Sequence, residues 1–162
     1  MRKGIDIRIV AGLCLLSLLS LSAYAASSRS AVGSWKLDLT KSSFGKMTPP
    51  KLELLTVTVD EPDKLQWKLT GASADGKTYF SSYNGAVDGK EHAMVSSEQG
   101  ATIAYSRTAP GGVSWVTKDK SGKVIETGTS QLSPDGSTLT LKGTVETGNR
   151  KDNFVSVFQR TQ

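Results

Sequence analysis

Cysteine and histidine are nearly absent from this chain of 162 residues: each occurs once, as Cys14 and His92. One cysteine excludes a disulfide within the chain and any zinc site built from several thiolates. One histidine removes most metal sites and leaves no second imidazole for paired acid–base chemistry. No Gly-x-Ser-x-Gly or His-Glu-x-x-His motif is present, and no phosphate-binding glycine-rich turn leads to a helix. The sequence therefore predicts no enzyme, no catalytic residues, no metal site and no cofactor.

The overall composition is that of a globular module. Hydrophobic residues make up 37% of the chain and charged residues 22%. This is too apolar for a disordered chain and too polar for a protein that crosses a membrane several times. A chain of this length is expected to form one compact domain.

The N-terminal segment has the pattern of a signal peptide. Arg2, Lys3 and Arg8 precede an apolar run over residues 10–21. A run of roughly a dozen residues is too short to cross a bilayer, which takes about 20. Ala23 and Ala25 are the small residues that a signal peptidase requires. We therefore predict a signal peptide over 1–25, a flexible leader over 26–32 and one domain over 33–162, exported to the periplasm or secreted.

Cleavage after Ala25 changes the charge and the chemistry of the mature chain. A lipoprotein anchored through Cys14 is the alternative, but Leu13 stands where a small residue is expected. Cleavage removes three cations and one anion, which leaves 17 Lys and Arg against 14 Asp and Glu, or +3 over 137 residues. These cations are scattered singly, without the cluster that a phosphate backbone requires. We predict no nucleic-acid partner and no stable membrane span.

The mature sequence alternates between apolar and polar residues with a period of two, which is typical of half-buried strands. Turn signals such as Asp75-Gly76, Asn84-Gly85 and Pro134-Asp135-Gly136 separate these segments and favour hairpins. A long meander exposes its edges unless its ends meet. We therefore predict an all-β fold, an antiparallel up-and-down β-barrel of about 8–10 strands. The predicted strands cover residues 33–39, 52–59, 64–70, 78–83, 101–107, 113–117, 124–132, 139–145 and 154–160.

Other segments carry weaker signals. The loop over 40–50 interrupts the alternation and is expected to fold over one mouth of the barrel. Residues 86–100, which include His92, fit either a short strand or a loose flap. The glycines are expected to serve turns. Glu53, Glu126 and Glu146 alternate with apolar neighbours, so we expect them on outer faces.

Gly33-Ser34-Trp35 on the first predicted strand, with Arg160 on the last, resembles the pattern of lipocalins and the wider calycin superfamily. The resemblance implies that Trp35 closes the barrel floor and that Arg160 packs across its ring. A guanidinium over an indole contributes about 0.5–2 kcal/mol. The stretch from Gly33 to Gly45 is similar to the start of small secreted bacterial lipocalin-like proteins. Avidin-like barrels share the Gly-x-Trp opening, but the polar side chains that hold biotin cannot be placed here.

Aromatic residues on different strands are the candidate ligand-binding residues. Pointing inward, they either fill the barrel or line a pocket, and the pattern leaves both open. Tyr105 and Arg107, two residues apart on one face, are the candidate polar anchor. The full predicted set is Trp67, Phe80, Tyr105, Arg107, Trp115 and Phe154.

Two functions follow from this interpretation. The first is a monomeric, exported, lipocalin-like binding protein with a small apolar or amphipathic ligand inside the barrel. The alternative is a protein-interaction module, such as a periplasmic inhibitor, with a packed barrel and no ligand. Bacterial metalloprotease inhibitors resemble this second plan, in which the leader inserts into a protein partner.

Overall fold

A computed structural model describes residues 30–98, 100–108 and 111–161 of the chain. The predicted signal peptide over 1–25, with Cys14 and the cleavage position, lies outside these residues, and so does the leader over 26–29. Within the described ranges, no helix is long and apolar enough to span a lipid bilayer.

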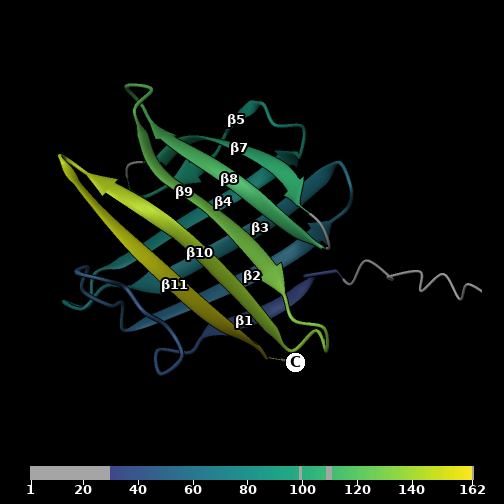
Figure 1. Cartoon of the computed structure of the whole chain (residues 1–162), viewed down its shortest axis with the longest axis horizontal. Helices are drawn as coiled ribbons and strands as arrows, with labels where there is room; N and C mark the ends of the chain where they lie inside the picture. Colours follow the sequence, from purple (N-terminus) through teal and green to yellow (C-terminus); the bar gives the residue numbers. More distant parts are fainter. Residues whose placement is uncertain (1–29, 99, 109–110, 162) are drawn as a thin grey trace, which may run out of the picture.

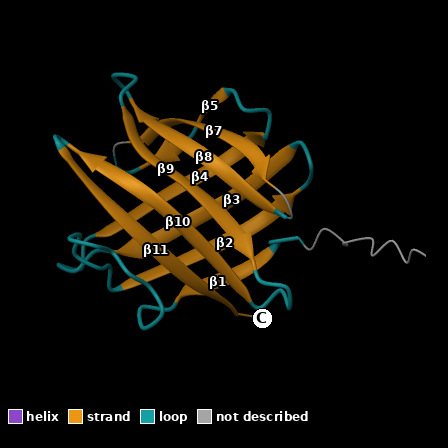
Figure 2. Cartoon of the chain, in the orientation of Figure 1, coloured by secondary structure: helices purple, strands orange, loops and turns teal. Residues whose placement is uncertain are grey.

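The described residues form strands, turns and loops, and none of them lies in an α-helix (Figure 2). The eleven strands are β1 (Gly33–Leu37), β2 (Leu52–Asp60), β3 (Lys64–Ala72), β4 (Thr78–Ala86), β5 (Glu91–Ala93), β6 (Val95–Ser96), β7 (Gly100–Thr108), β8 (Gly112–Asp119), β9 (Val124–Leu132), β10 (Thr138–Thr147) and β11 (Arg150–Thr161).

One antiparallel sheet contains all eleven strands, in the order β5-β7-β8-β9-β10-β11-β1-β2-β3-β4-β6. The first strand pairs with the last, so the wall of β8–β11 crosses the wall of β1–β4 around a shared interior (Figure 1). This confirms the predicted all-β up-and-down barrel. The strand count exceeds the prediction because residues 86–100 supply two short strands, β5 and β6.

The barrel is nearly closed, with its seam between β4 and β7. These two strands are not paired in the sheet, and β5 and β6 occupy the space beside them. The Gly89 amide donates to the Tyr105 carbonyl at 2.7 Å, and the rings of Tyr83 and Tyr105 lie 5.1 Å apart across the seam. Side-chain packing thus replaces ladder hydrogen bonds along much of this line.

Three glycines that were expected to serve turns lie instead within strands, opposite aromatic residues. Gly71 pairs with Tyr79, Gly128 with Trp115 and Gly143 with Phe154. A Cβ added at any of the three would overlap the facing ring. The missing side chain lets each ring lie flat over its neighbouring strand, which allows the wall to curve.

The two ends of the barrel differ. The Trp35 end carries the turns after β2 and β9 and the segment over 30–32; the Glu126 end carries the turns after β3, β8 and β10. The loop over 38–51 lies along β11, since Ser43 and Val155 exchange backbone hydrogen bonds of 2.8 and 2.7 Å. Phe44 from this loop packs against the core, whose most deeply buried side chains are Trp35 and Phe158.

Candidate functional site

Arg160 and Trp35 close one end of the barrel. They are direct partners in the β1–β11 ladder, and the Arg160 guanidinium carbon lies 4.1 Å from the centroid of the indole. Arg160 also donates to the carbonyls of Val32 at 2.6 Å and Gly136 at 2.8 Å. Gly33 has a φ of +146°, and a Cβ there would overlap the guanidinium. These contacts are the physical reason for glycine at this position.

The described end of the leader, residues 30–32, contacts the barrel through Ala31 and Val32. The Ala31 amide donates to Asp60 Oδ2 at 2.7 Å, and its carbonyl accepts from the Trp35 indole at 2.9 Å. Asp60 in turn pairs with Arg107 at 2.6 Å, and Arg107 also donates to the Glu61 carbonyl. Arg107 therefore clamps the turn after β2 rather than offering an unpaired anchor.

An apolar cavity of about 110 Å³ lies between this clamp and the middle of the barrel. Four of the predicted ligand-binding residues line it: Trp67, Tyr105, Arg107 and Trp115. Leu55, Val57, Leu65, Leu69, Val113, Leu139 and Leu141 supply apolar walls. An engineered apolar cavity of about 150 Å³ holds a benzene molecule. This cavity alone is therefore too small for a long-chain lipid.

Aromatic side chains form a layer across the middle of the barrel. The ring centroids of Tyr105 and Trp115 lie 6.5 Å apart, and Tyr83 adjoins Tyr105 across the seam. Burial raises the pKa of Tyr105, and the nearby Trp67 indole opposes this. The Trp67 Nε1–H itself is buried and meets no acceptor at hydrogen-bond geometry in the described structure. The layer thus holds an unsatisfied donor, an arrangement that is uncommon in filled protein cores.

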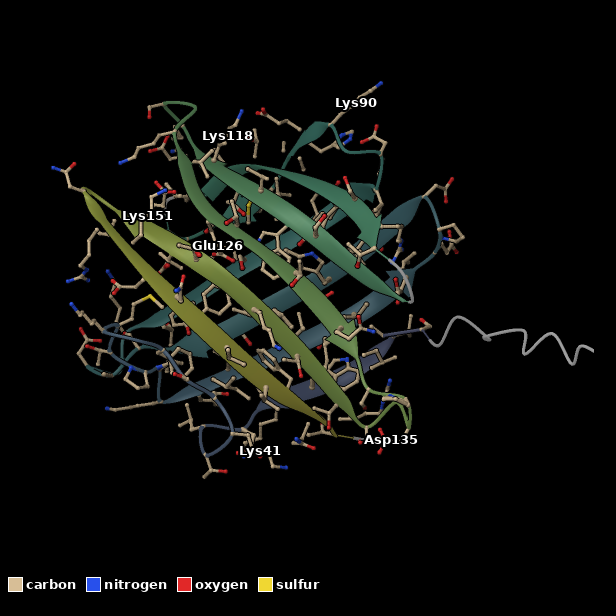
Figure 3. All side chains as sticks on the ribbon, viewed as in Figure 1. Lys41, Lys90, Lys118, Glu126, Asp135 and Lys151 are labelled. Carbon is tan, nitrogen blue, oxygen red and sulfur yellow. The ribbon has the colours of Figure 1, made fainter. Side chains whose placement is uncertain are left out.

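A second hollow, of about 490 Å³, opens on the other side of Trp67; we call it the Glu126 hollow. Its walls are more polar than those of the apolar cavity. Glu126 projects over the middle of the molecule in Figure 3, whereas Lys41, Lys90 and Asp135 lie at its margin. The lining includes Trp67, Ser81, Met94, Ser96, Glu98, Ile103, Thr117, Glu126 and Glu146, with Lys77 from the turn after β3.

Glu53 and Glu126 point inward, so the expectation that they lie on outer faces is wrong. Glu53 shares a face of β2 with buried Leu55 and accepts from the Tyr79 hydroxyl at 2.5 Å. Glu126 accepts from the Trp115 indole at 2.9 Å. Desolvation raises the pKa of both carboxyls, and the charge of Glu98 adds to the increase.

The alternation with a period of two could have predicted that Glu53 and Glu126 point inward. Counting back in twos from Leu55 reaches Glu53, and counting back from buried Leu132 reaches Glu126. Their polarity outweighed this phase in the sequence interpretation. Glu146 differs, because it forms a 2.6 Å ion pair with Lys151 at the rim.

The remaining two predicted residues lie elsewhere. Phe154 points inward and packs against the core opposite Gly143, lining neither hollow. Phe80 lies on the outer face of β4 with 43% of its surface exposed, so its predicted inward orientation is wrong. The reason is again the phase of the alternation, since Tyr79 and Ser81 occupy the inner face. Phe80 lines a shallow outer groove with Leu52 and Leu54.

Comparisons with known proteins support the fold alone. No family model matches the chain, and no curated protein matches it. A redesigned β-barrel superposes with a TM-score of 0.52 at 12% identity, covering 82% of this chain and 92% of its own. Rv2717c from M. tuberculosis gives a TM-score of 0.52 at 16% identity, covering 82% and 93%. A zebrafish ileal bile acid-binding protein complexed with cholic acid gives 0.47 at 12% identity, covering 82% and 100%. The likeness to the redesigned barrel agrees with the β-barrel fold described above.

His92 stands apart from both hollows. It lies on β5 and forms a 2.9 Å contact with Asp88, which lowers the pKa of that carboxyl. Neither hollow has His92 in its lining. Among the residues that the structure places, no group of three or more His, Cys, Asp or Glu is arranged to hold a metal ion.

Residues 71–78 match the letters of the nucleotide-binding pattern Gly-x₄-Gly-Lys-Thr, but the structure gives them another role. They form the end of β3, the turn and the start of β4, with no helix following. The turn uses its own amides: Gly76 donates to the Ser73 carbonyl at 2.8 Å, and Lys77 donates to Asp75 Oδ1 at 3.2 Å. These two amides are therefore occupied within the turn itself.

Proposed function

We propose that this chain is a binding protein that holds a small apolar or amphipathic molecule inside its barrel. The observation that carries the proposal is the pair of hollows on either side of Trp67, of about 110 and 490 Å³. The interaction-module alternative requires a barrel filled by its own side chains, which would leave neither. The larger hollow falls within the range of small-molecule sites, roughly 300–1,000 Å³.

The two ends of the barrel favour one route for the ligand. At the Trp35 end, residues 30–32 cross the barrel and are tied to Asp60, Trp35 and Arg160. At the Glu126 end, the larger hollow reaches the turns after β3 and β10. A ligand that enters from the Glu126 end crosses the Glu126 hollow and reaches the aromatic layer before the apolar cavity. Its apolar part then packs against Trp67.

Two neighbouring serines on β4 provide a matched test. Ser81 lines the Glu126 hollow, whereas Ser82 faces outward and lines the outer groove. We expect a neutral apolar fluorophore such as N-phenyl-1-naphthylamine to bind the wild-type protein saturably. Ser81→Trp should fill the hollow and abolish binding, while Ser82→Trp should leave it unchanged. Thermal unfolding of both variants shows whether each one still folds.

The outcomes separate the alternatives. Absence of saturable binding to the wild-type protein, across neutral, anionic and cationic probes, would overturn the proposal. Binding that survives Ser81→Trp and disappears in Ser82→Trp would place the site in the outer groove instead. If Ser81→Trp does not fold, a second measurement replaces this variant. Competing apolar molecules displace the fluorophore from the wild-type protein, and the indole signals of Trp67 and Trp35 report where they bind.

Export and the absence of catalysis are part of the same proposal. The support for export is the charged and apolar pattern over residues 1–25. Mass spectrometry of the protein isolated from an expressing bacterium should give a chain that begins at Ala26. The support for binding rather than catalysis is the position of His92, away from both hollows. A bound molecule should therefore be recovered chemically unchanged.

A further inference from the structure

We infer that the ligand of this barrel carries a positively charged head group, which is recognised by Glu126 in the wall of the Glu126 hollow and by the nearby Glu53 behind that wall. The inference rests on the proposed function and narrows its ligand to organic cations with an apolar body. Its support comes from the charges within the barrel, the aromatic layer beside them and the sign of the net charge.

The two carboxyl groups lack cationic partners within the barrel. Among the described residues, neither Glu53 nor Glu126 forms an ion pair. Each accepts one neutral donor: the Tyr79 hydroxyl for Glu53 and the Trp115 indole for Glu126. By contrast, the third inward acid of this end, Asp152, pairs with Arg150 at 2.7 Å. A buried carboxylate without a cation is costly, and a cationic ligand would relieve that cost.

The charges that line the hollow are mainly negative. Glu98 and Glu126 line it, and the charge of Glu98 raises the pKa of both Glu53 and Glu126. Glu146 is neutralised by Lys151 at the rim. Lys77 is the one cation among the lining residues, and it belongs to the exposed turn after β3. An ammonium group inside the hollow therefore meets more carboxyl groups than cations.

The aromatic layer offers a second kind of contact to a cation. Trp67 lines both the hollow and the apolar cavity, and Tyr105 and Trp115 adjoin it. Aromatic faces attract organic cations, most strongly where water is excluded. The buried Trp67 Nε1–H lies near the Tyr105 hydroxyl but meets no acceptor at hydrogen-bond geometry in the described structure. Beside Glu53 and Glu126, the aromatic layer therefore offers an apolar surface and one hydrogen-bond donor without an acceptor.

The net charge of the whole protein has the opposite sign. The chain carries +5, and +3 after the predicted cleavage. Long-range electrostatics would therefore favour an anionic ligand. A preference for cations can therefore arise only from the charged and aromatic groups around the hollow. A measured preference for cationic over anionic ligands would identify these groups, and not the net charge, as its cause.

Three probes with the same alkyl chain test the inference: octylammonium, octanol and octanoate. At neutral pH we expect octylammonium to bind at least about tenfold more tightly than octanol, and octanoate to bind most weakly. Glu126→Gln should reduce the preference, and Glu126→Gln with Glu53→Gln should abolish it while octanol still binds. Glu61→Gln, at the Trp35 end, is the matched control and should keep it. In the wild-type protein, octylammonium should move the Trp67 indole N–H resonance and leave that of Trp35 in place.

Each outcome has a distinct meaning. If octanol and octanoate bind as tightly as octylammonium, the inference is overturned and the proposed function stands. If the ammonium preference persists unchanged in the double variant, Glu53 and Glu126 do not recognise the head group, and the inference is again overturned. If none of the three probes binds and the neutral fluorophore also fails, the proposed function itself is lost. Should the double variant not fold, the single variants and the indole resonances decide the question.

Discussion

Trp35 and Arg160 are direct partners across the pair of strands, β1 and β11, that joins the two walls of the barrel. The guanidinium carbon of Arg160 lies 4.1 Å from the indole centroid, and Trp35 is fully buried. The same guanidinium holds the carbonyls of Val32 and Gly136. One side chain thus links the segment before β1, the first strand, the last strand and the turn after β9.

Replacement of this arginine tests its contribution to barrel closure. Arg160→Met keeps the aliphatic length and removes the charge and the donors. We expect the free energy of unfolding to fall by about 1–3 kcal/mol, because the cation–π contact and the charged hydrogen bonds are lost. Chemical denaturation monitored by tryptophan fluorescence measures the change. Lys120→Met in the exposed turn after β8 is the control and should leave stability within about 0.5 kcal/mol.

Asp60 and Arg107 are expected to depend on each other in their contributions to the free energy of unfolding. The Asp60 side chain is 8% exposed and that of Arg107 is 28% exposed. Arg107→Met leaves a buried carboxylate with only the Ala31 amide, and we expect a loss of about 2–4 kcal/mol. Asp60→Asn should cost less in the Arg107→Met background than in the wild-type protein. Urea denaturation of the four proteins gives the coupling, and strictly additive losses would contradict it.

The buried Glu126 should give stability a distinctive pH dependence. Its pKa is raised above the ordinary value of 4.5, so the unfolded chain loses the proton first as the pH increases. The folded state therefore becomes less stable as the pH rises above about 4.5, until the folded-state group also ionises. Glu126→Gln removes this loss and still accepts from Trp115. We expect the variant to be more stable than the wild-type protein at pH 7 and equally stable near pH 4, as measured by denaturation across that range. A variant that is less stable at pH 7 would contradict this.

Gly128 should tolerate no side chain. A Cβ at this position would overlap the Trp115 ring and approach the Lys142 carbonyl oxygen to 2.8 Å. Gly128→Ala is expected to lower the free energy of unfolding by about 1–3 kcal/mol, because the ring or the backbone must move. Thr129→Ala, on the exposed outer face of the same strand, should change it by less than about 0.5 kcal/mol. Equal losses in the two variants would show that the ring does not depend on this glycine.

The candidate site was predicted only in part, and the reason lies in the range of each interaction. Trp67, Tyr105 and Trp115 were found because each continues an apolar alternation that is visible within a few residues. Phe80 was placed on the wrong face because its strand carries aromatic residues on both faces. Glu53 and Glu126 were missed because their polarity outweighed the alternation, and because the donors that satisfy them, Tyr79 and Trp115, lie 26 and 11 residues away in the sequence.

The sequence by itself determined the local part of this protein: the alternation with period two, the turns between strands and hence an antiparallel meander. These depend on neighbouring residues, so the pattern contains them. The tertiary structure decided what depends on register across the sheet: the pairing of β1 with β11, the seam beside β4 and the direction of each buried acid. A shift of one residue along a strand exchanges its inner and outer faces. Only the folded barrel therefore shows that Trp67 lies between an apolar cavity and an acidic hollow.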